Sequence, residues 1–454
     1  MATETRIDTY LEEHLASYID LIIRLCKQPS ISSSGEGVEQ CARLVCEVLN
    51  EHEINTAPYQ TPGFPIIIGK KEGKSKRTLL FYNHYDVQPA DPLELWDHPP
   101  FEPAVEAGKL YARGARDDKG EFVSRIAAVM AVNEVLGYLP CNVKFLLEGE
   151  EECGSPHLAD FVQNHIEDIR SDGAIWEEGY VEAGEYPTLT LGVRGILYIE
   201  MSVQTMTADA HSGLAHVLPN AAWRLHNALR TIRSSDSKIL IPGFYKEVIK
   251  PDEKEKALFD KWPDAGNLWK EQYGLMGFSD NLEGSQLRYA VFDPTCNLDG
   301  FGSGYLGYGT KTVIPSKAMA KMDFRLVPNQ DPEDIVQKLR HHLNDEGFGD
   351  IEIKVLGKMN PFRTPIDDPL VDLSVRKGEE VYGKPVLIGP IATWSSPVHA
   401  VAHPLGIPVV NPGIGYWDNR SHAPNEHIRI KDFLNGARHI ARIILDFDKL
   451  LPTD

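Results

Sequence analysis

The run T-L-L-F-Y at residues 78–82 decides the fold, because it predicts a buried strand that ends just before His84 and Asp86. A second apolar run, V-K-F-L-L at residues 143–147, leads into an acidic cluster at residues 148–152 in the same way. In open α/β sheets the functional site lies beyond the carboxyl ends of the strands. We therefore expect imidazole and carboxylate groups to gather at one edge of a sheet.

Strands and helices alternate at both ends of the chain. Short apolar stretches at residues 174–176 and 407–410 run towards Glu178 and towards the loop that carries His422, respectively. Apolar residues recur at helical spacing in the segments 7–23, 38–49, 121–136 and 430–447. This alternation predicts a largely parallel sheet with helices on both of its faces.

The middle of the chain has a different pattern, which we interpret as a second domain. Its order is β-α-β-β-α-β, the split βαβ or ferredoxin-like arrangement, with an insert rich in Gly, Asp and aromatic residues at about residues 234–309. The strands are predicted at 197–203, 312–314, 318–326 and 351–355, and the helices at 220–232 and 332–343. The predicted fold class is α/β, with a mostly parallel-sheet catalytic domain at residues 1–194 and 365–454 that is interrupted by a ferredoxin-like domain at residues 195–364.

The composition is that of a soluble globular protein and disfavours several functions. The 454 residues suffice for two or three domains, and the net charge of −20 disfavours binding to nucleic acid or to an anionic membrane. We see neither a secretory signal nor an apolar run long enough to span a membrane. The six cysteines form no C-x-x-C pair, which indicates reduced thiols in a cytoplasmic protein and argues against a zinc–thiolate site.

Each chemically interesting fragment has an ordinary interpretation when it is taken alone. His84 and Asp86 could lie on an ordinary surface, Asp117 could cap the helix that follows it, and the glutamates could form a solvated turn. Taken together, however, adjacent glutamates at the end of a buried strand repel one another unless a cation or a proton compensates them. The order and the placement of these residues therefore favour a metal site.

Two metals that share one bridging carboxylate need about four further ligands. The sequence supplies Asp117 as the bridge, and the further ligands are His84, Glu152, Glu178 and His422. Nitrogen and oxygen donors without thiolate suit Zn²⁺ or Mn²⁺, with Co²⁺ as a further candidate. Glu151, adjacent to a ligand, can then take a proton from the attacking water.

At these residues the sequence resembles a two-metal peptidase superfamily that includes aminoacylase, glutamate carboxypeptidase, succinyl-diaminopimelate desuccinylase and carnosinase. It is most similar to the carnosinase-like cytosolic dipeptidases, over nearly the whole chain. The strings that carry the resemblance are H-Y-D-V-Q-P at 84–89, L-Y-A-R-G-A-R-D-D-K-G at 110–120, L-L-E-G-E-E-E-C-G-S at 146–155, L-G-V-R-G-I at 191–196, A-H-S-G at 210–213, F-R-L-V-P-N at 324–329 and S-H-A-P-N-E at 421–426.

The resemblance implies a phosphorylase/hydrolase-like catalytic domain and a second domain that serves as a lid and in dimerisation. It implies two divalent metal ions per subunit, bridged by Asp117, with His84 and Glu178 completing one site and Glu152 and His422 completing the other. Asp86 would support His84, and Glu151 would be the general base and then the general acid. The peptide bond between Asp117 and Asp118 would be cis.

The substrate contacts implied by the resemblance come from the second domain and from a loop. His211 would cross a dimer interface and stabilise the oxyanion in the partner's site. Arg325 would hold the C-terminal carboxylate of the substrate through a bidentate pair. Ser395 belongs to a substrate-binding loop that reads Gly-Ser-Ile-Pro in the carnosinase branch and W-S-S-P at 394–397 in this chain.

Two departures from the carnosinase pattern bear on specificity. That branch usually has Asp at position 178, and Glu177 is an adjacent rival, although the spacing back from Gly192 favours Glu178. In the loop, Trp394 stands where the branch has Gly. A Trp there would fill space beside the substrate, which predicts a narrower or differently shaped pocket.

The sequence therefore predicts a metal-dependent hydrolase of dipeptides or short peptides that acts through a water activated by two metals. We expect a cytoplasmic homodimer that binds neither nucleic acid nor membrane. The alternative with the same chemistry is an N-acyl-amino-acid amidohydrolase. A phosphoesterase is disfavoured because no cluster of Arg and Lys lies beside the ligands, and a non-catalytic metal-binding scaffold is disfavoured by the complete set of ligands and base.

Overall fold

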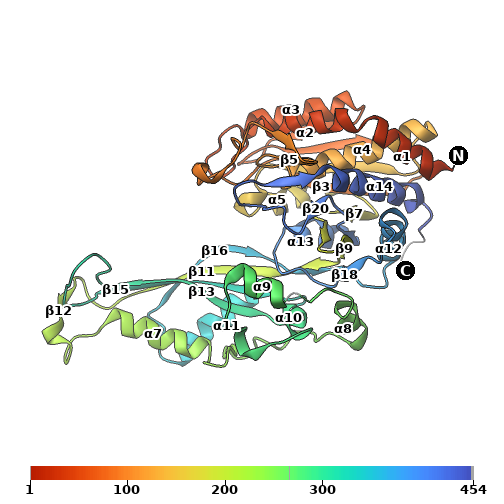
Figure 1. The fold of residues 1–454 in the computed structure, drawn as a ribbon. Coiled ribbons are helices and arrows are strands. Elements are labelled where there is room, and N and C mark those ends of the chain that lie inside the picture. Colours follow the sequence, from red (N-terminus) through yellow and green to blue (C-terminus); the bar gives the residue numbers. More distant parts are fainter. Residues whose placement is uncertain (1, 265, 451–454) are drawn as a thin grey trace.

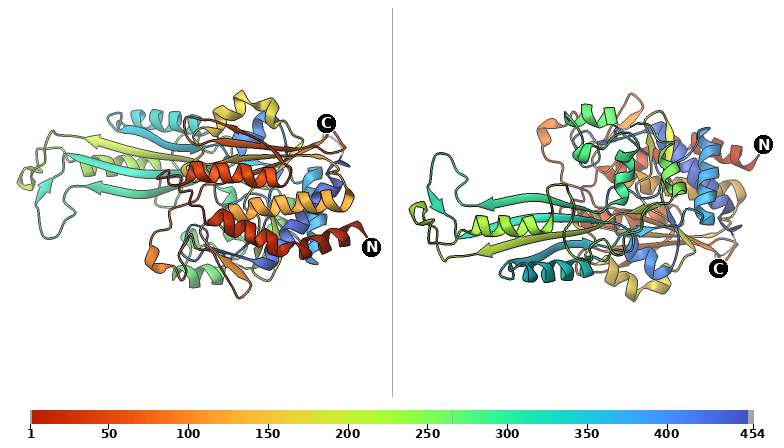
Figure 2. Two further views of the ribbon diagram at one scale, coloured as in Figure 1. Left: turned by 90° about the horizontal axis from the view of Figure 1, so that it is seen from above. Right: turned by 90° about the horizontal axis from the view of Figure 1, so that it is seen from below.

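The computed structural model describes residues 2–264 and 266–450. Figure 1 shows both ends of the chain gathered in one lobe, and the middle of the chain in a second, elongated lobe that extends away from it. The two further views in Figure 2 show the same separation. The catalytic domain expected at residues 1–194 and 365–454 includes residues 1 and 451–454, which lie outside the described residues.

The first lobe is built on a six-stranded mixed sheet. β3 pairs in parallel with β6 and β7, and β7 pairs in parallel with β19, whereas β1 and β2 are antiparallel. Its strands, in spatial order, are β1 (Asn55–Tyr59), β2 (Ile66–Lys71), β6 (Asn142–Glu148), β3 (Thr78–His84), β7 (Gly173–Ile175) and β19 (Val409–Val410). The carboxyl ends of β3 and β6 meet, since His84 lies opposite Glu148 in their register.

The central strand β3 is an unbroken apolar run because it is covered on both faces. Leu79 and Phe81 pack into the core beneath the long helices, whereas Leu80 and Tyr82 pack into a second core on the opposite face. The first core involves α1 (Thr3–Glu13), α2 (Leu15–Cys26), α3 (Val38–Glu51), α4 (Lys119–Leu136), α12 (Pro369–Tyr382) and α14 (Ile430–Phe447), and the second involves α5 (Leu158–Asn164) and α13 (Val398–Leu405). The predicted N-terminal helix is in fact two helices, which meet at His14.

Small sheets and short elements connect these layers. A four-stranded sheet has the order β18 (Leu387–Gly389), β9 (Tyr186–Thr190), β8 (Tyr180–Glu182) and β20 (Gly415–Tyr416). A three-stranded sheet is formed by β21 (His427–Arg429), β5 (Lys109–Tyr111) and β4 (Ala104–Glu106), and a pair by β10 (Gly192–Val193) and β17 (Phe362–Arg363). The short helix α6 (Ile166–Ile169) precedes β7.

The second lobe is a four-stranded antiparallel sheet with two helices packed against its buried face. In chain order its elements are β11 (Gly195–Gln204), α7 (Ala221–Ile232), β13 (Thr295–Ser303), β15 (Lys317–Leu326), α11 (Pro332–Asp345) and β16 (Glu352–Met359). The spatial order of the strands is β13-β15-β11-β16. The chain order is the predicted β-α-β-β-α-β sequence.

The second strand of this sheet differs from the prediction. Residues 312–314 were expected to form it, but β14 (Val313–Ile314) pairs with β12 (Ala210–His211) in a separate ribbon. The sheet strand is β13, which comes from the end of the predicted insert. Its sequence T-C-N-L-D-G-F-G-S resembles that of a loop. Such a sequence is tolerated in this strand because the strand lies at the edge of the sheet, is largely exposed and contains an irregularity between Leu298 and Gly300.

The remainder of the insert folds back towards the first lobe. It contains α8 (Glu253–Phe259), α9 (Gly266–Tyr273) and α10 (Gln286–Tyr289). Phe259, Val291 and Phe292 form a small core with Ile391, which belongs to the first lobe. In Figure 1, α8 lies below β18. The insert therefore makes a wall between the two lobes.

In the ranges 2–264 and 266–450, no helix combines the length and the apolar character that crossing a bilayer requires.

Candidate metal centre

The carboxylate of Asp117 lies between two imidazoles. Its Oδ1 is 2.9 Å from Nε2 of His84, and its Oδ2 is 3.0 Å from Nε2 of His422. Nε2 of His422 is also 3.3 Å from Oε2 of Glu152. Asp117 is buried, whereas the His422 side chain is half exposed. Each carboxylate oxygen of Asp117 therefore faces a different potential nitrogen ligand, which is the arrangement that a bridging ligand requires.

His84 is oriented by Asp86, two residues further along the chain. Its Nδ1 lies 3.0 Å from the backbone oxygen of Asp86 and 3.4 Å from Oδ1. Acceptors on this side favour a proton on Nδ1, which leaves Nε2 free for a metal. The Asp86 carboxylate also accepts hydrogen bonds from the backbone N–H groups of Glu151 and Glu152, at 3.2 and 3.1 Å. Asp86 thus ties the end of β3 to the turn that carries both glutamates.

The backbone around Asp117 is held by Glu426, which sequence reasoning missed. The fully buried Glu426 carboxylate accepts hydrogen bonds from the backbone N–H groups of Gly114, Arg116 and Asp117 at 2.9–3.1 Å. It also accepts one from the Arg113 guanidinium, at 2.6 Å. Because Glu426 follows His422 by four residues, one carboxylate joins the loop of His422 to the loop of Asp117. No local signal in S-H-A-P-N-E indicates this contact, since it joins segments far apart in the sequence.

The peptide bond between Asp117 and Asp118 is cis, as the resemblance implied. The Asp118 carboxylate accepts hydrogen bonds from the Asn83 amide at 2.7 Å and from the backbone N–H of His84 at 3.0 Å. Asp118 therefore holds the end of β3, whereas Asp117 faces the imidazole rings. Burial raises the pKa of Asp118 to about 7.

Glu177 lies with His84 in a cluster of potential metal ligands. Two clusters of potential ligands have their donor atoms within 4.8 Å of one another, namely His84–Asp118–Glu177 and Asp117–Glu152–His422. Glu177 is buried, and its Oε1 accepts a hydrogen bond from Ser396 Oγ at 2.8 Å. Glu178 belongs to neither cluster, but it is buried near the same groups: burial and the Asp117 carboxylate raise its pKa to about 7, against the opposing effects of Arg116, His84 and His422. The expectation based on spacing back from Gly192 therefore stays a prediction.

The backbone distinguishes these two adjacent glutamates. β7 ends at Ile175, and Glu178 has a φ of 70°, in the left-handed region that non-glycine residues rarely adopt. Glu178 also lines a cavity together with Arg116. The sequence cannot show which of the two adjacent positions has the left-handed backbone, because both carry a glutamate side chain.

Like charges are concentrated in this site. Burial raises the pKa of Glu151 well above its usual range, and the nearby Glu152, Asp117 and Asp86 carboxylates add to the effect. Burial also raises the pKa of Glu177, and the Glu151 carboxylate raises it further. The hydrogen-bonding contacts with Asp117 and Glu152 raise the pKa of His422 to about 11. Bringing these carboxylates together requires positive charge.

The residues present fit two divalent metal ions. Oε2 of Glu177 is buried and has no hydrogen-bond partner within the described chain, and buried Oδ2 of Asp117 faces only the potential ligand His422. Buried carboxylate oxygens without a donor are costly unless a cation or a proton satisfies them. All the donor atoms are imidazole nitrogens or carboxylate oxygens, which suit Zn²⁺ or Mn²⁺.

Two of the predicted substrate-binding residues meet between the lobes. Arg325, on β15, donates a hydrogen bond from Nη1 to Ser395 Oγ at 2.9 Å. His211 lies elsewhere, in β12, and Figure 1 places that element at the far end of the elongated lobe. Its Nδ1 accepts a hydrogen bond from the Gly213 N–H at 3.0 Å, so the proton resides on Nε2. Within this chain, His211 does not approach the metal centre.

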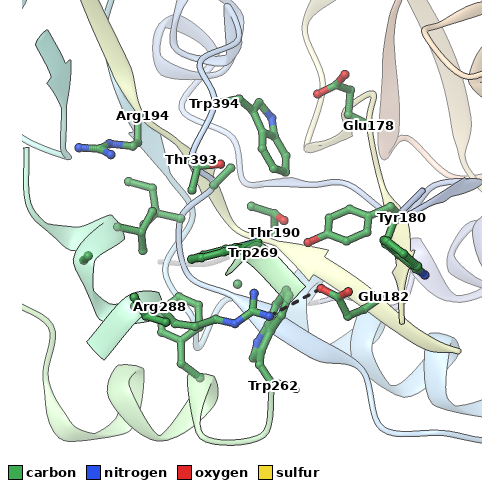
Figure 3. Close-up of a pocket in the computed structure, with 18 of the residues that line it drawn as sticks. Glu178, Tyr180, Glu182, Thr190, Arg194, Trp262, Trp269, Arg288, Thr393 and Trp394 are labelled. Carbon is green, nitrogen blue, oxygen red and sulfur yellow. Dashed lines mark ion pairs between the residues drawn. The ribbon is translucent and has the colours of Figure 1, made fainter. Parts of the chain in front are cut away.

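A cavity of about 570 Å³ adjoins the centre. Figure 3 shows Glu178 and Trp394 at one end and Trp262 and Arg288 at the other. Trp394, which was expected to make the pocket narrower or differently shaped, forms one wall of this cavity. Facing walls come from the insert, which could not be placed from the sequence of the loop.

Comparison with known proteins connects this geometry to a family. The model of peptidase family M20/M25/M40 matches residues 80–446, which is more than half of the chain. The Cys-Gly metallodipeptidase of Schizosaccharomyces pombe is 29% identical over 403 residues, covering 86% of this chain and 84% of the relative. The human Beta-Ala-His dipeptidase is 28% identical over 402 residues, covering 85% and 78%.

Solved structures share the fold over almost the full length. An M20 family metallo-carboxypeptidase from Sulfolobus solfataricus is 34% identical with a TM-score of 0.90, covering 95% of this chain and 99% of that structure. The di-peptidase Dug1p of Saccharomyces cerevisiae superposes with a TM-score of 0.81 at 24% identity, covering 99% of both chains.

Proposed function

The chain belongs to peptidase family M20/M25/M40, and from this premise we propose that it hydrolyses dipeptides or short peptides at a two-metal centre bridged by Asp117. The observation that carries the proposal is the position of Asp117, whose two oxygens face His84 and His422 separately at 2.9 and 3.0 Å. The dipeptide substrate is inferred from the metallodipeptidase and Beta-Ala-His dipeptidase relatives.

We assign one metal to His84, Asp117 and Glu177, and the other to Asp117, Glu152 and His422. Glu177 replaces the Glu178 of the sequence-based prediction, because Glu177 shares a cluster with His84 and has an unpartnered buried oxygen. Asp118, the other carboxylate of that cluster, is already engaged by Asn83 and by the backbone of His84. Zn²⁺ and Mn²⁺ are the proposed metals, with Co²⁺ as a further candidate.

Bound divalent metals supply Lewis-acid polarisation of the scissile carbonyl and a lowered pKa for the attacking water. Glu151 moves the proton: its carboxylate accepts the proton of the attacking water and delivers it to the nitrogen of the leaving amine. The N–H of Glu151 is held by Asp86, which fixes the turn that carries this base. Burial raises the pKa of Glu151, and the higher pKa makes its carboxylate a stronger base.

Residues of the second lobe bind the rest of the substrate in this proposal. Arg325 and Ser395 are joined by a hydrogen bond and together would receive the C-terminal carboxylate. The exposed His211 would donate a hydrogen bond from Nε2 to the developing oxyanion of the partner subunit's site in a homodimer. The distance of β12 from the metal centre within one chain agrees with a contribution in trans.

The test is hydrolysis of a small panel by metal-stripped protein reconstituted with Zn²⁺ or with Mn²⁺. The panel pairs Ala- and Gly-containing dipeptides with N-acetyl amino acids. Metal-dependent cleavage of the dipeptides is the expected result. Cleavage of the N-acetyl amino acids alone would contradict the dipeptide assignment, and cleavage without metal would contradict the mechanism.

A further inference from the structure

The cavity beside the metal centre begins next to the proposed ligands. Arg116, Glu178 and Ser421 line it, and each is the chain neighbour of a proposed ligand, namely Asp117, Glu177 and His422 respectively. A group bound in the cavity therefore extends directly from the reacting centre. The cavity volume of about 570 Å³ is within the usual range for small-molecule pockets.

Seven aromatic side chains line the cavity. Those of the first lobe come from β8, β20 and the adjoining loops, whereas those of the second lobe come from the insert. The aromatic residues that line it are Tyr180, Phe259, Trp262, Trp269, Trp394, Tyr416 and Trp417. Rings of this kind favour an apolar, flat ligand through burial and offset stacking.

At the end of the cavity that Trp262 lines, Arg288 and Glu182 have partners within the protein. The Arg288 guanidinium lies 3.9 Å from the Glu182 carboxylate, donates to the Pro263 backbone oxygen at 3.1 Å and lies 4.6 Å from the centre of the Trp262 ring. Figure 3 shows the Arg288–Glu182 pair at the end of the cavity away from Trp394. These pairings suit this end of the cavity to a neutral group, because a charged one would compete with them.

The position of the insert is fixed by contacts with the first lobe. The Trp262 indole donates a hydrogen bond to the Ile388 backbone oxygen at 3.1 Å, and Phe259 packs with Ile391. The aromatic residues that mark the insert in the sequence are therefore held against the catalytic lobe. The insert, which contributes no group to the proposed chemistry, therefore has a role in forming the cavity wall.

The orientation of the substrate in the site follows from its contacts with Arg325 and Ser395. Because those contacts belong to the proposed function, the inference about the cavity rests on it. Arg325 and Ser395 are assigned to the carboxylate of the leaving residue, and neither is among the described residues that line the cavity. We propose that the cavity receives the side chain on the acyl side of the scissile bond and selects a large aromatic side chain there.

The test compares kcat/KM for Trp-Ala, Ala-Trp, Glu-Ala and Ala-Ala. Wild-type enzyme should prefer Trp-Ala over Ala-Ala by at least about tenfold, since even one methylene in an apolar pocket gives ten- to 200-fold discrimination. Trp262→Ala should reduce this ratio by about tenfold and leave the Ala-Trp to Ala-Ala ratio unchanged. A ratio measured on one preparation does not depend on the folded fraction, so partial misfolding of the variant leaves the test valid.

Two variants complete the design. Trp269→Ala removes a second wall of the cavity and should reduce the same ratio. Tyr273→Ala is the matched control, because Tyr273 is an exposed aromatic residue of the same helix that does not line the cavity. The control should keep the wild-type ratio.

The outcomes separate the two proposals. Equal rates for Trp-Ala and Ala-Ala, a preference for Glu-Ala, or a selective loss of Ala-Trp hydrolysis in Trp262→Ala would each overturn the aromatic acyl-side pocket while leaving dipeptide hydrolysis intact. Failure to hydrolyse any dipeptide in the presence of metal would instead overturn the proposed function, and with it the assignment of the cavity.

Discussion

The metal centre and the aromatic cavity adjoin each other but are constructed differently. The centre consists of side chains at buried strand ends and on loops clamped by buried carboxylates such as Asp86 and Glu426. The cavity lies between the first lobe, which supplies most of its lining residues, and the short helices of an insert, which pack against that lobe through a small core that includes Ile391. The comparison indicates that the scaffold fixes the chemistry while a peripheral segment completes the proposed substrate pocket. Changes in the centre should therefore alter turnover, metal content or stability, and changes in the cavity should alter binding.

The largest effect is expected at Glu151. Replacing it with Gln removes the proton acceptor, so kcat should fall by about 10²- to 10⁴-fold. Metal content, measured by elemental analysis, should be unchanged. Glu150→Gln is the matched control, since Glu150 is the adjacent glutamate and pairs with His157 at 2.7 Å. Near-normal turnover by Glu151→Gln would contradict the assigned role.

A large loss of stability is expected for Glu426→Gln. The Arg113 guanidinium would remain buried without its charged partner, and breaking such a pair costs about 3–5 kcal/mol. Denaturant unfolding of the metal-free variant measures this loss without a contribution from metal binding. The exposed pair of Arg24 and Glu47 supplies the control, because Glu47→Gln should change stability by less than about 1 kcal/mol. Equal small losses in both variants would show that Glu426 does not clamp the Asp117 loop.

The adjacent glutamates allow a sharper test of the centre. Glu177→Gln should lower the affinity for one of the two metals by more than about tenfold, since changing a group that only hydrogen-bonds to a ligand already costs ten- to 100-fold. Glu178→Gln should retain both metals, because Glu178 faces the cavity. Isothermal titration of the metal-free variants measures both. The opposite pattern would restore Glu178 as the ligand.

The smallest effect is expected at the edge of the cavity. Trp394→Gly removes one wall without touching the proposed ligands. KM for a dipeptide should therefore rise by about two- to fivefold while kcat stays near its wild-type value, because the bound substrate and the transition state lose the same contact. Steady-state kinetics on Ala-Ala provide the measurement. A fall in kcat beyond about tenfold would show that the two regions are not separable.

Some parts of the molecule could be predicted because their signals are local. The apolar run of β3 is continuous and that of β6 is interrupted by Lys144, since both strands are covered over most of their length, and their ends place His84 and the glutamate turn correctly along the chain. The long helices α4 and α14 show an apolar pattern over their length. Such segments carry their structural information within a single stretch of sequence.

Other parts depend on contacts between distant segments. The choice between Glu177 and Glu178 depends on a left-handed residue, and the clamp by Glu426 depends on a loop about 310 residues earlier. The edge strand β13 was taken for part of the insert because its glycines and its Asp resemble a loop. The cavity was not foreseen, because its walls come from segments that meet only in the folded chain.

The most direct test of the central claim is titration of metal-stripped protein with Zn²⁺ and, separately, with Mn²⁺, while Ala-Ala hydrolysis is followed. The bridging position of Asp117 predicts that activity rises to a plateau at two metal ions per chain and that Asp117→Asn abolishes both binding and activity. Full activity at one metal ion per chain, or activity in the metal-free protein, would contradict a two-metal centre.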